Sequence, residues 1–127
     1  MNRLPIVLAA TATLAALALA ACSREEPSVS FSKDVQPVLN ARCGACHVPG
    51  QPGYEASGLS TASYAALMEG TKFGEVVIPG DPLSSVLTML VEGRADPSIR
   101  MPHGDQPLPD AEKKILRDWV AQGAKNN

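Results

Sequence analysis

The chain has 127 residues, of which 45% are hydrophobic, 19% are charged and 4% are aromatic, and its formal net charge is −2. This balance is typical of one globular domain and argues against an intrinsically disordered protein. The slight acidic excess and the lack of a Lys- and Arg-rich run argue against nucleic acid as a partner, because phosphate backbones are bound by basic surfaces.

The first 21 residues have the pattern of an export signal. Arg3 is followed by an almost uninterrupted apolar run, 4–21, which is rich in Ala and ends at Cys22. This composition favours a cleaved signal peptide over residues 1–21 rather than a retained membrane-spanning helix. The sequence Leu19-Ala20-Ala21-Cys22 resembles the lipobox of bacterial lipoproteins, which implies cleavage before Cys22 and a lipid on its thiol. An ordinary secretory signal that leaves this thiol free is the alternative.

A short linking segment precedes the folded part of the chain. Residues 22–29 have no apolar period and are predicted to form a lipidated flexible tether, with one domain over residues 30–127. That domain is expected to begin with a helix for which Ser30 or Ser32 is the N-cap. Pro37 is compatible with this helix only near its start.

The most informative motif, Cys43-Gly44-Ala45-Cys46-His47, directly follows the first predicted helix. In an exported chain, two thiols at this spacing with an adjacent imidazole are the attachment sequence for haem c. Each thiol can bond one vinyl group, while His47 is presented to the iron as the proximal ligand. Its other ring nitrogen is expected to donate to a backbone carbonyl, with Pro49 or Pro52 as the candidate acceptor.

Two other interpretations of the same cysteines are a zinc site and a thiol–disulfide centre. Zinc would take Cys43, Cys46, His47 and His103, but two adjacent residues reach one tetrahedral centre poorly and a second closely spaced ligand pair is missing. A redox Cys-x-x-Cys pair is expected near a strand–helix–strand unit, and the sequence does not indicate one.

The rest of the chain is predicted to be helices and loops. Residues 48–58 contain three Gly and two Pro and are expected to form a loop around the cofactor. Helices are expected over residues 62–69, 83–91 and 110–122, from apolar periodicity and from cap signals at Thr61, Asp81-Pro82, Gly70, Gly93 and Gly123. The sequence therefore predicts an all-α fold of about four short helices and Pro- and Gly-rich loops wrapped around one covalent haem. Helices this short need packing partners, and a haem would enlarge a core that is poor in aromatic residues.

The candidates for the distal ligand of the iron are Met68, Met89, Met101 and His103. Met68 and Met89 fall on predicted helices among Leu and Val, where methionine usually fills the core. Met101 precedes Pro102 in an irregular segment, which favours an extended backbone that can present a thioether. Met101 is thus the predicted distal ligand, and His103 is the alternative because the two residues compete for one coordination position.

Several segments match a known pattern: Phe31, residues 34–39, residues 42–47, Gly58-Leu59, residues 78–82, Ser85, Leu87, residues 100–102 and residues 110–124. In these the chain resembles small class I-like c-type cytochrome domains related to the planctomycete-type cytochrome c family. The resemblance implies covalent haem, His/Met ligation and an all-α fold in which the first and last helices cross. Pro109 stands where a capping Ser is usual and His103 where a second Pro is common, which keeps His103 open as a ligand.

We therefore expect an exported, lipid-anchored monohaem cytochrome that carries single electrons between redox protein partners. No Ser/His/Asp set, phosphate-binding Gly loop or carboxylate pair indicates an enzyme. The alternatives are a haem-based sensor of gases or small ligands, in which Met101 is labile, and an accessory haem subunit of a larger oxidoreductase. The expected location is the cell envelope, facing the periplasm. The outer membrane is favoured over the inner because Ser23, after the lipidated Cys22, is not a retention signal of the Asp type.

Overall fold

The computed structural model describes residues 27–104 and 106–127, and the predicted signal peptide, Cys22 and the first part of the tether lie outside these residues. The described part folds into five α-helices and two short helical turns, with one β-bridge, Thr71 to Gly74. The elements are η1 (Phe31–Val35), α1 (Gln36–Arg42), α2 (Pro52–Ser57), α3 (Tyr64–Glu69), α4 (Val86–Val91), η2 (Pro97–Ile99) and α5 (Asp110–Ala121). This confirms the predicted all-α class and adds one helix. None of these helices is long and apolar enough to cross a bilayer.

The domain begins with one wide helical turn, η1, which continues directly into α1. The Ser30 hydroxyl accepts a hydrogen bond from the Lys33 N–H, and the Ser30 carbonyl accepts from the N–H groups of Asp34 and Val35 at 2.9 and 3.2 Å. Pro37 is the second residue of α1, just after the junction where the wide turn of η1 passes into the α-helix. The predicted cap at Ser30 and the position of Pro37 near a helix start are confirmed.

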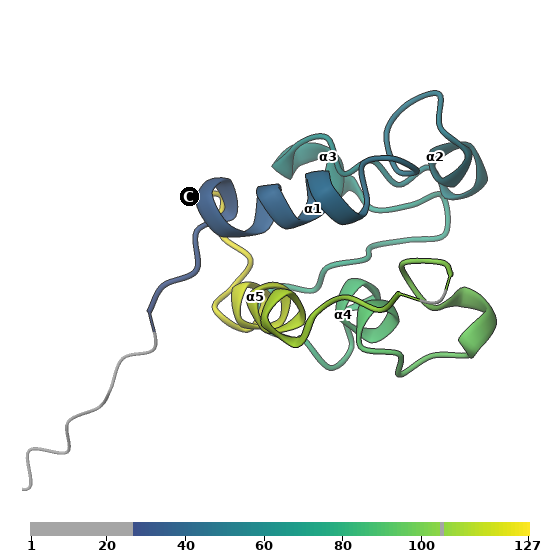
Figure 1. The fold of residues 1–127 in the computed structure, drawn as a ribbon. Coiled ribbons are helices and arrows are strands. Elements are labelled where there is room, and N and C mark those ends of the chain that lie inside the picture. The colour runs from purple at the N-terminus through teal and green to yellow at the C-terminus, as the bar shows by residue number, and fades with distance from the viewer. Residues whose placement is uncertain (1–26, 105) are drawn as a thin grey trace, which may run out of the picture.

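An aromatic cluster joins the first and last helices of the domain. The Phe31 ring lies 5.2 Å from the Tyr64 ring and 5.4 Å from the Trp119 ring, measured between centroids. The Tyr64 hydroxyl donates to the Ala124 carbonyl, and the Trp119 indole N–H donates to the Lys125 carbonyl, both at 2.9 Å. Both buried polar groups are therefore paired, as buried aromatic side chains require. In Figure 1, α5 is seen almost end-on below α1, so the two helices cross.

The segment 48–58, predicted to be a loop, contains α2. Pro52 occupies the first turn of this helix and Gly58 ends it with φ of 80°. The Ser57 hydroxyl also donates to the Gly53 carbonyl at 2.7 Å. The loop prediction was wrong because Pro at a helix start and Gly at a helix end delimit a helix here, whereas the sequence analysis took both as breakers.

The structure also moves the start of α3. Ser63 caps α3 in place of the predicted Thr61, and its hydroxyl accepts from the Ala66 N–H at 3.2 Å. Thr61 is buried, and its hydroxyl and N–H both donate to the His47 carbonyl, at 3.1 and 2.8 Å. The residue predicted to be the cap thus holds the Cys43–His47 motif instead.

The start of α4 is later than predicted. This helix begins at Val86, since the preceding Ser85 is extended, with φ of −67° and ψ of 122°. The buried Ser85 hydroxyl donates to the Asp81 carbonyl and accepts from the Ile78 N–H, both at 2.8 Å. These bonds hold residues 78–85 as a separate turn ahead of the helix.

The last helix, α5, begins at Asp110 as predicted and ends just before Gly123, whose φ is 98°. It pairs with α4 through Glu92, which accepts from Arg94 at 2.6 Å and from Arg117 of α5 at 2.7 Å. In Figure 1 the end of the chain returns to the start of η1. The loop after α1, α2 and the loop after η2 lie at the opposite end of the molecule.

Candidate functional site

His47 lies in a tight turn that directly follows α1. The N–H groups of Cys46 and His47 both donate to the Cys43 carbonyl, at 3.0 and 2.9 Å. The Nδ1 atom of His47 is buried and has no hydrogen-bond partner among the described residues. The prediction that Pro49 or Pro52 accepts from this nitrogen is therefore wrong. A buried unpaired polar atom costs free energy, and such an atom is often a sign of function.

The His47 imidazole is enclosed by α2 and by the residues that follow it. A Cβ atom on Gly53 would lie 2.9 Å from the ring atom Cε1 and 3.1 Å from Nδ1, so α2 rests directly on the ring. Burial lowers the pKa of His47; the nearby Leu59 backbone raises this pKa, and the charge of His103 lowers it. The Leu59 backbone approaches the ring without completing a hydrogen bond to Nδ1. The neutral imidazole, the form that binds metals, is favoured.

The two cysteines of the motif are free thiols in different surroundings. Cys43 is the C-cap of α1 and packs against the core, whereas Cys46 is exposed. Burial raises the pKa of Cys43 to about 11, with smaller contributions from Glu112 and Cys46. Glu112 itself accepts two hydrogen bonds from the Arg42 guanidinium, at 2.8 and 2.9 Å. A thiol–disulfide centre needs a cysteine with a lowered pKa, so this environment disfavours that interpretation.

The candidate distal ligands lie on the loop after η2. Met101 is half-buried against the core, and its N–H donates to the Leu90 carbonyl at 3.3 Å, which ties this loop to the end of α4. His103 is exposed, and its charge lowers the pKa of His47. Met68 and Met89 lie on α3 and α4, and both are half-buried.

The donor set is poor for zinc. The described residues contain no group of three or more His, Cys, Asp or Glu side chains that could hold a metal ion. The set Cys43, Cys46, His47 and His103 is therefore not assembled as a tetrahedral site. A shallow groove between α1 and α3, lined by residues such as Gln36 and Tyr64, contains none of these side chains.

Sequence reasoning missed the residues that enclose His47. Gly53 was assigned to a loop, and Leu59 was given no role. The available signal was the Pro52-Gly53 pair, because a glycine inside a helix indicates close approach of another group once the proline is taken as a helix start.

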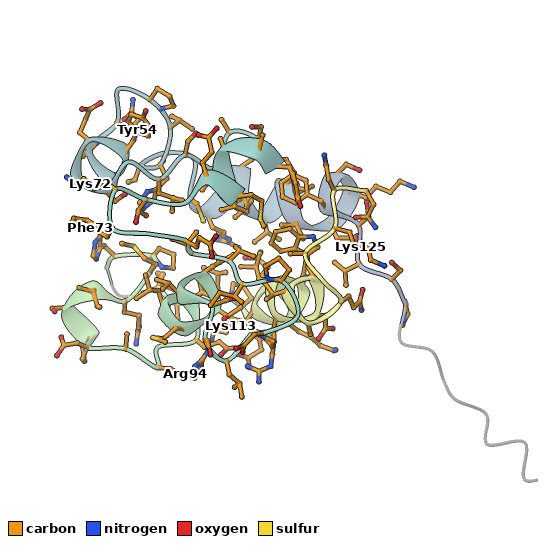
Figure 2. The ribbon with its side chains drawn as sticks, turned by 180° about the vertical axis from the view of Figure 1, so that it is seen from behind. Tyr54, Lys72, Phe73, Arg94, Lys113 and Lys125 are labelled. Carbon is orange, nitrogen blue, oxygen red and sulfur yellow. The ribbon has the colours of Figure 1, made fainter. Side chains whose placement is uncertain are left out.

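Exposed apolar side chains lie at the same end of the molecule. Phe73, on the turn between Thr71 and Gly74, is 81% exposed, and Lys72 lies over its ring at 5.3 Å. Figure 2 shows Phe73 projecting outward at the end opposite the N-terminal segment. The turn is held against the end of α2 by a hydrogen bond from the Lys72 N–H to the Ser57 carbonyl at 2.9 Å.

Comparisons of the chain with protein-family models, with curated proteins and with solved structures found no significant match. The resemblance to small c-type cytochromes stays a prediction from the sequence.

Proposed function

We propose that this chain is a monohaem c-type cytochrome that carries single electrons between redox partners in the cell envelope. The observation that best supports the proposal is the Cys43–His47 turn, in which an imidazole enclosed by α2 follows two free thiols, Cys43 and Cys46. His103, two residues after Met101, lowers the pKa of His47 through its charge. These residues provide the two attachment points and the two axial ligands that haem c requires.

In this proposal Cys43 and Cys46 hold the haem through thioether bonds, and His47 is the proximal ligand. Met101 is the distal ligand, with His103 as the alternative. When bound, the haem supplies the one-electron chemistry. The chain packs α2 against the imidazole at Gly53, and burial favours the neutral ring, which is the form that binds iron.

The distribution of apolar side chains supports a cofactor at this end of the domain. The aromatic cluster fills the end where the chain termini meet, whereas Phe73, on the Thr71–Gly74 turn, is 81% exposed and Ile99, at the end of η2, is 50% exposed. A haem between the motif and the Met101 loop would supply apolar surface to a core that these side chains leave incomplete.

A lipid on Cys22 places the protein on a membrane that faces the periplasm, with the outer membrane favoured. The partners are then other redox proteins, and the chain itself is not an enzyme. Redox contacts of this kind are small and transient.

The test is the absorption spectrum of the full chain, produced in a bacterium with a c-type cytochrome maturation system. We expect the bands of reduced haem c, retained after denaturation because the haem is covalent, and a spectrum that carbon monoxide does not change. The matched control is Cys43→Ser with Cys46→Ser, which should abolish covalent haem. A wild-type chain without haem bands would overturn the proposal. A prompt shift with carbon monoxide would instead favour the sensor.

A further inference from the structure

Two side-chain amides hold the segment that leads into the domain. The Gln122 Oε1 accepts from the Val29 N–H at 2.8 Å, and its Nε2 donates to the Pro27 carbonyl at 3.2 Å. Asn127 makes the same two kinds of hydrogen bond with residues two positions later in the segment. Its Oδ1 accepts from the Phe31 N–H at 2.8 Å, and its Nδ2 donates to the Val29 carbonyl at 3.4 Å. Each amide bridges the C=O of one residue and the N–H of the residue two positions later, as a residue in a neighbouring parallel strand does.

The backbone of Asn127 strengthens this attachment. Its carbonyl accepts from the Ser32 N–H and from the hydroxyls of Ser30 and Ser32, each at 2.9 Å. Val29 is also half-buried against the core. We call Gln122 and Asn127 together the clasp. The clasp holds residues 27–29, at the end of the predicted tether, on the surface of the domain.

The clasp and the candidate haem site lie at opposite ends of the molecule. In Figure 1 the N-terminal segment leaves the domain beside the end of the chain, and α1 runs from there toward the motif. The helical turns η1 and α1, of five and seven residues, separate the two ends by about 18 Å at 1.5 Å per residue. Figure 2 shows Lys125 at the clasp end and Phe73 at the other.

We propose that the clasp fixes where the membrane tether leaves the domain and so directs the haem site away from the bilayer. This inference rests on the proposed lipid at Cys22. With the clasp closed, the five peptide steps from Cys22 to Pro27 reach at most about 17 Å. With the clasp open, the eight steps to Ser30 reach about 27 Å. The redox partner that could reach the haem in this orientation is a protein that projects from the membrane or is soluble in the periplasm, because the haem end does not face lipid.

The inference is tested with the full lipidated protein on supported bilayers of phosphatidylethanolamine and phosphatidylglycerol. Gln122→Ala removes one amide of the clasp, and Gln122→Ala with Asn127→Ala removes both. Gln122→Glu keeps the acceptor for Val29 but loses the donor. The matched control is Gln51→Ala, an exposed amide at the other end of the domain. Hydrogen exchange at the Val29 amide reports the clasp, and neutron reflectometry reports the height of the protein layer above the lipid.

We expect roughly fivefold faster exchange at Val29 in Gln122→Ala, since a net hydrogen bond contributes about 1 kcal/mol. In the double variant, the protein layer should be thicker, or displaced from the lipid, by up to about 10 Å, because that is the tether length released when the clasp opens. The haem spectrum should not change. Gln122→Glu should show a smaller change in the same direction, and Gln51→Ala should show none.

The two proposals fail in different ways. Faster exchange with an unchanged layer height would mean that the clasp is only structural and would overturn the orienting role. If neither the wild type nor Cys22→Ser binds the bilayer, the proposed lipid anchor is wrong. The orienting role is then wrong as well.

Discussion

Gly53→Ala tests whether close packing of α2 orients His47. A methyl group at this position would lie 2.8 Å from the carbonyl oxygen of Cys46 and 2.9 Å from Cε1 of His47, both shorter than real carbon contacts. Alanine is favoured over glycine inside a helix by about 1 kcal/mol. Overpacking of a well-filled site costs about 1 to 3 kcal/mol. One contact is with backbone and the other with an enclosed ring, so relief requires α2 or the imidazole to move.

We expect Gly53→Ala to lower the free energy of unfolding by about 1 kcal/mol net, and to shift both the ring resonances of His47 and the reduction potential of the haem-loaded protein. Chemical denaturation, NMR and redox titration measure the three quantities. Ala56→Gly on the exposed face of α2 is the control: it weakens the same helix by about 1 kcal/mol without touching the ring. If Gly53→Ala stabilises the protein and leaves the His47 resonances in place, the packing argument is wrong.

Three further predictions concern other parts of the domain. Glu92→Gln should destabilise the protein at pH 7 by about 1 to 2 kcal/mol, because this partly buried carboxylate loses two arginine partners, and denaturation of both proteins measures the difference. Burial raises the pKa of Glu92, but hydrogen bonds from the two arginines outweigh it and lower this pKa below its ordinary value of 4.5. The stabilisation is therefore present above that value and is lost as the pH falls through the lowered pKa, so an equally large difference at pH 2.5 would contradict the assignment. Met101→Leu should open the haem iron to carbon monoxide, whereas Met89→Leu should not, and equal spectra in the two variants would remove Met101 as the ligand. In the haem-free protein at pH 8, iodoacetamide should modify Cys46 well before Cys43, because Cys43 is half-buried and its pKa of about 11 keeps it protonated, whereas Cys46 is exposed. Peptide mass spectrometry that finds the reverse order would refute this.

Local sequence signals predicted the helices whose ends are encoded by neighbouring residues. The start of α5 at Asp110, its end before Gly123 and the cap at Ser30 need no information from distant parts of the chain. The errors arose where one residue type has two uses. Pro52 and Gly58 delimit α2 although both were taken as loop residues. Backbone propensity leaves that choice open, and packing of the segment against His47 decides it.

The sequence by itself predicted the all-α class and fixed which donor atoms the candidate site offers, because the order of Cys43, Cys46 and His47 is a covalent property of the chain. Only the tertiary structure decided what surrounds that site and how the domain is held. Gly53 belongs to the site because it packs closely against the His47 ring. Gln122 accepts a hydrogen bond from Val29, which is 93 positions away in the sequence. Such contacts depend on where the folded backbone brings distant residues, and neither periodicity nor spacing records that position.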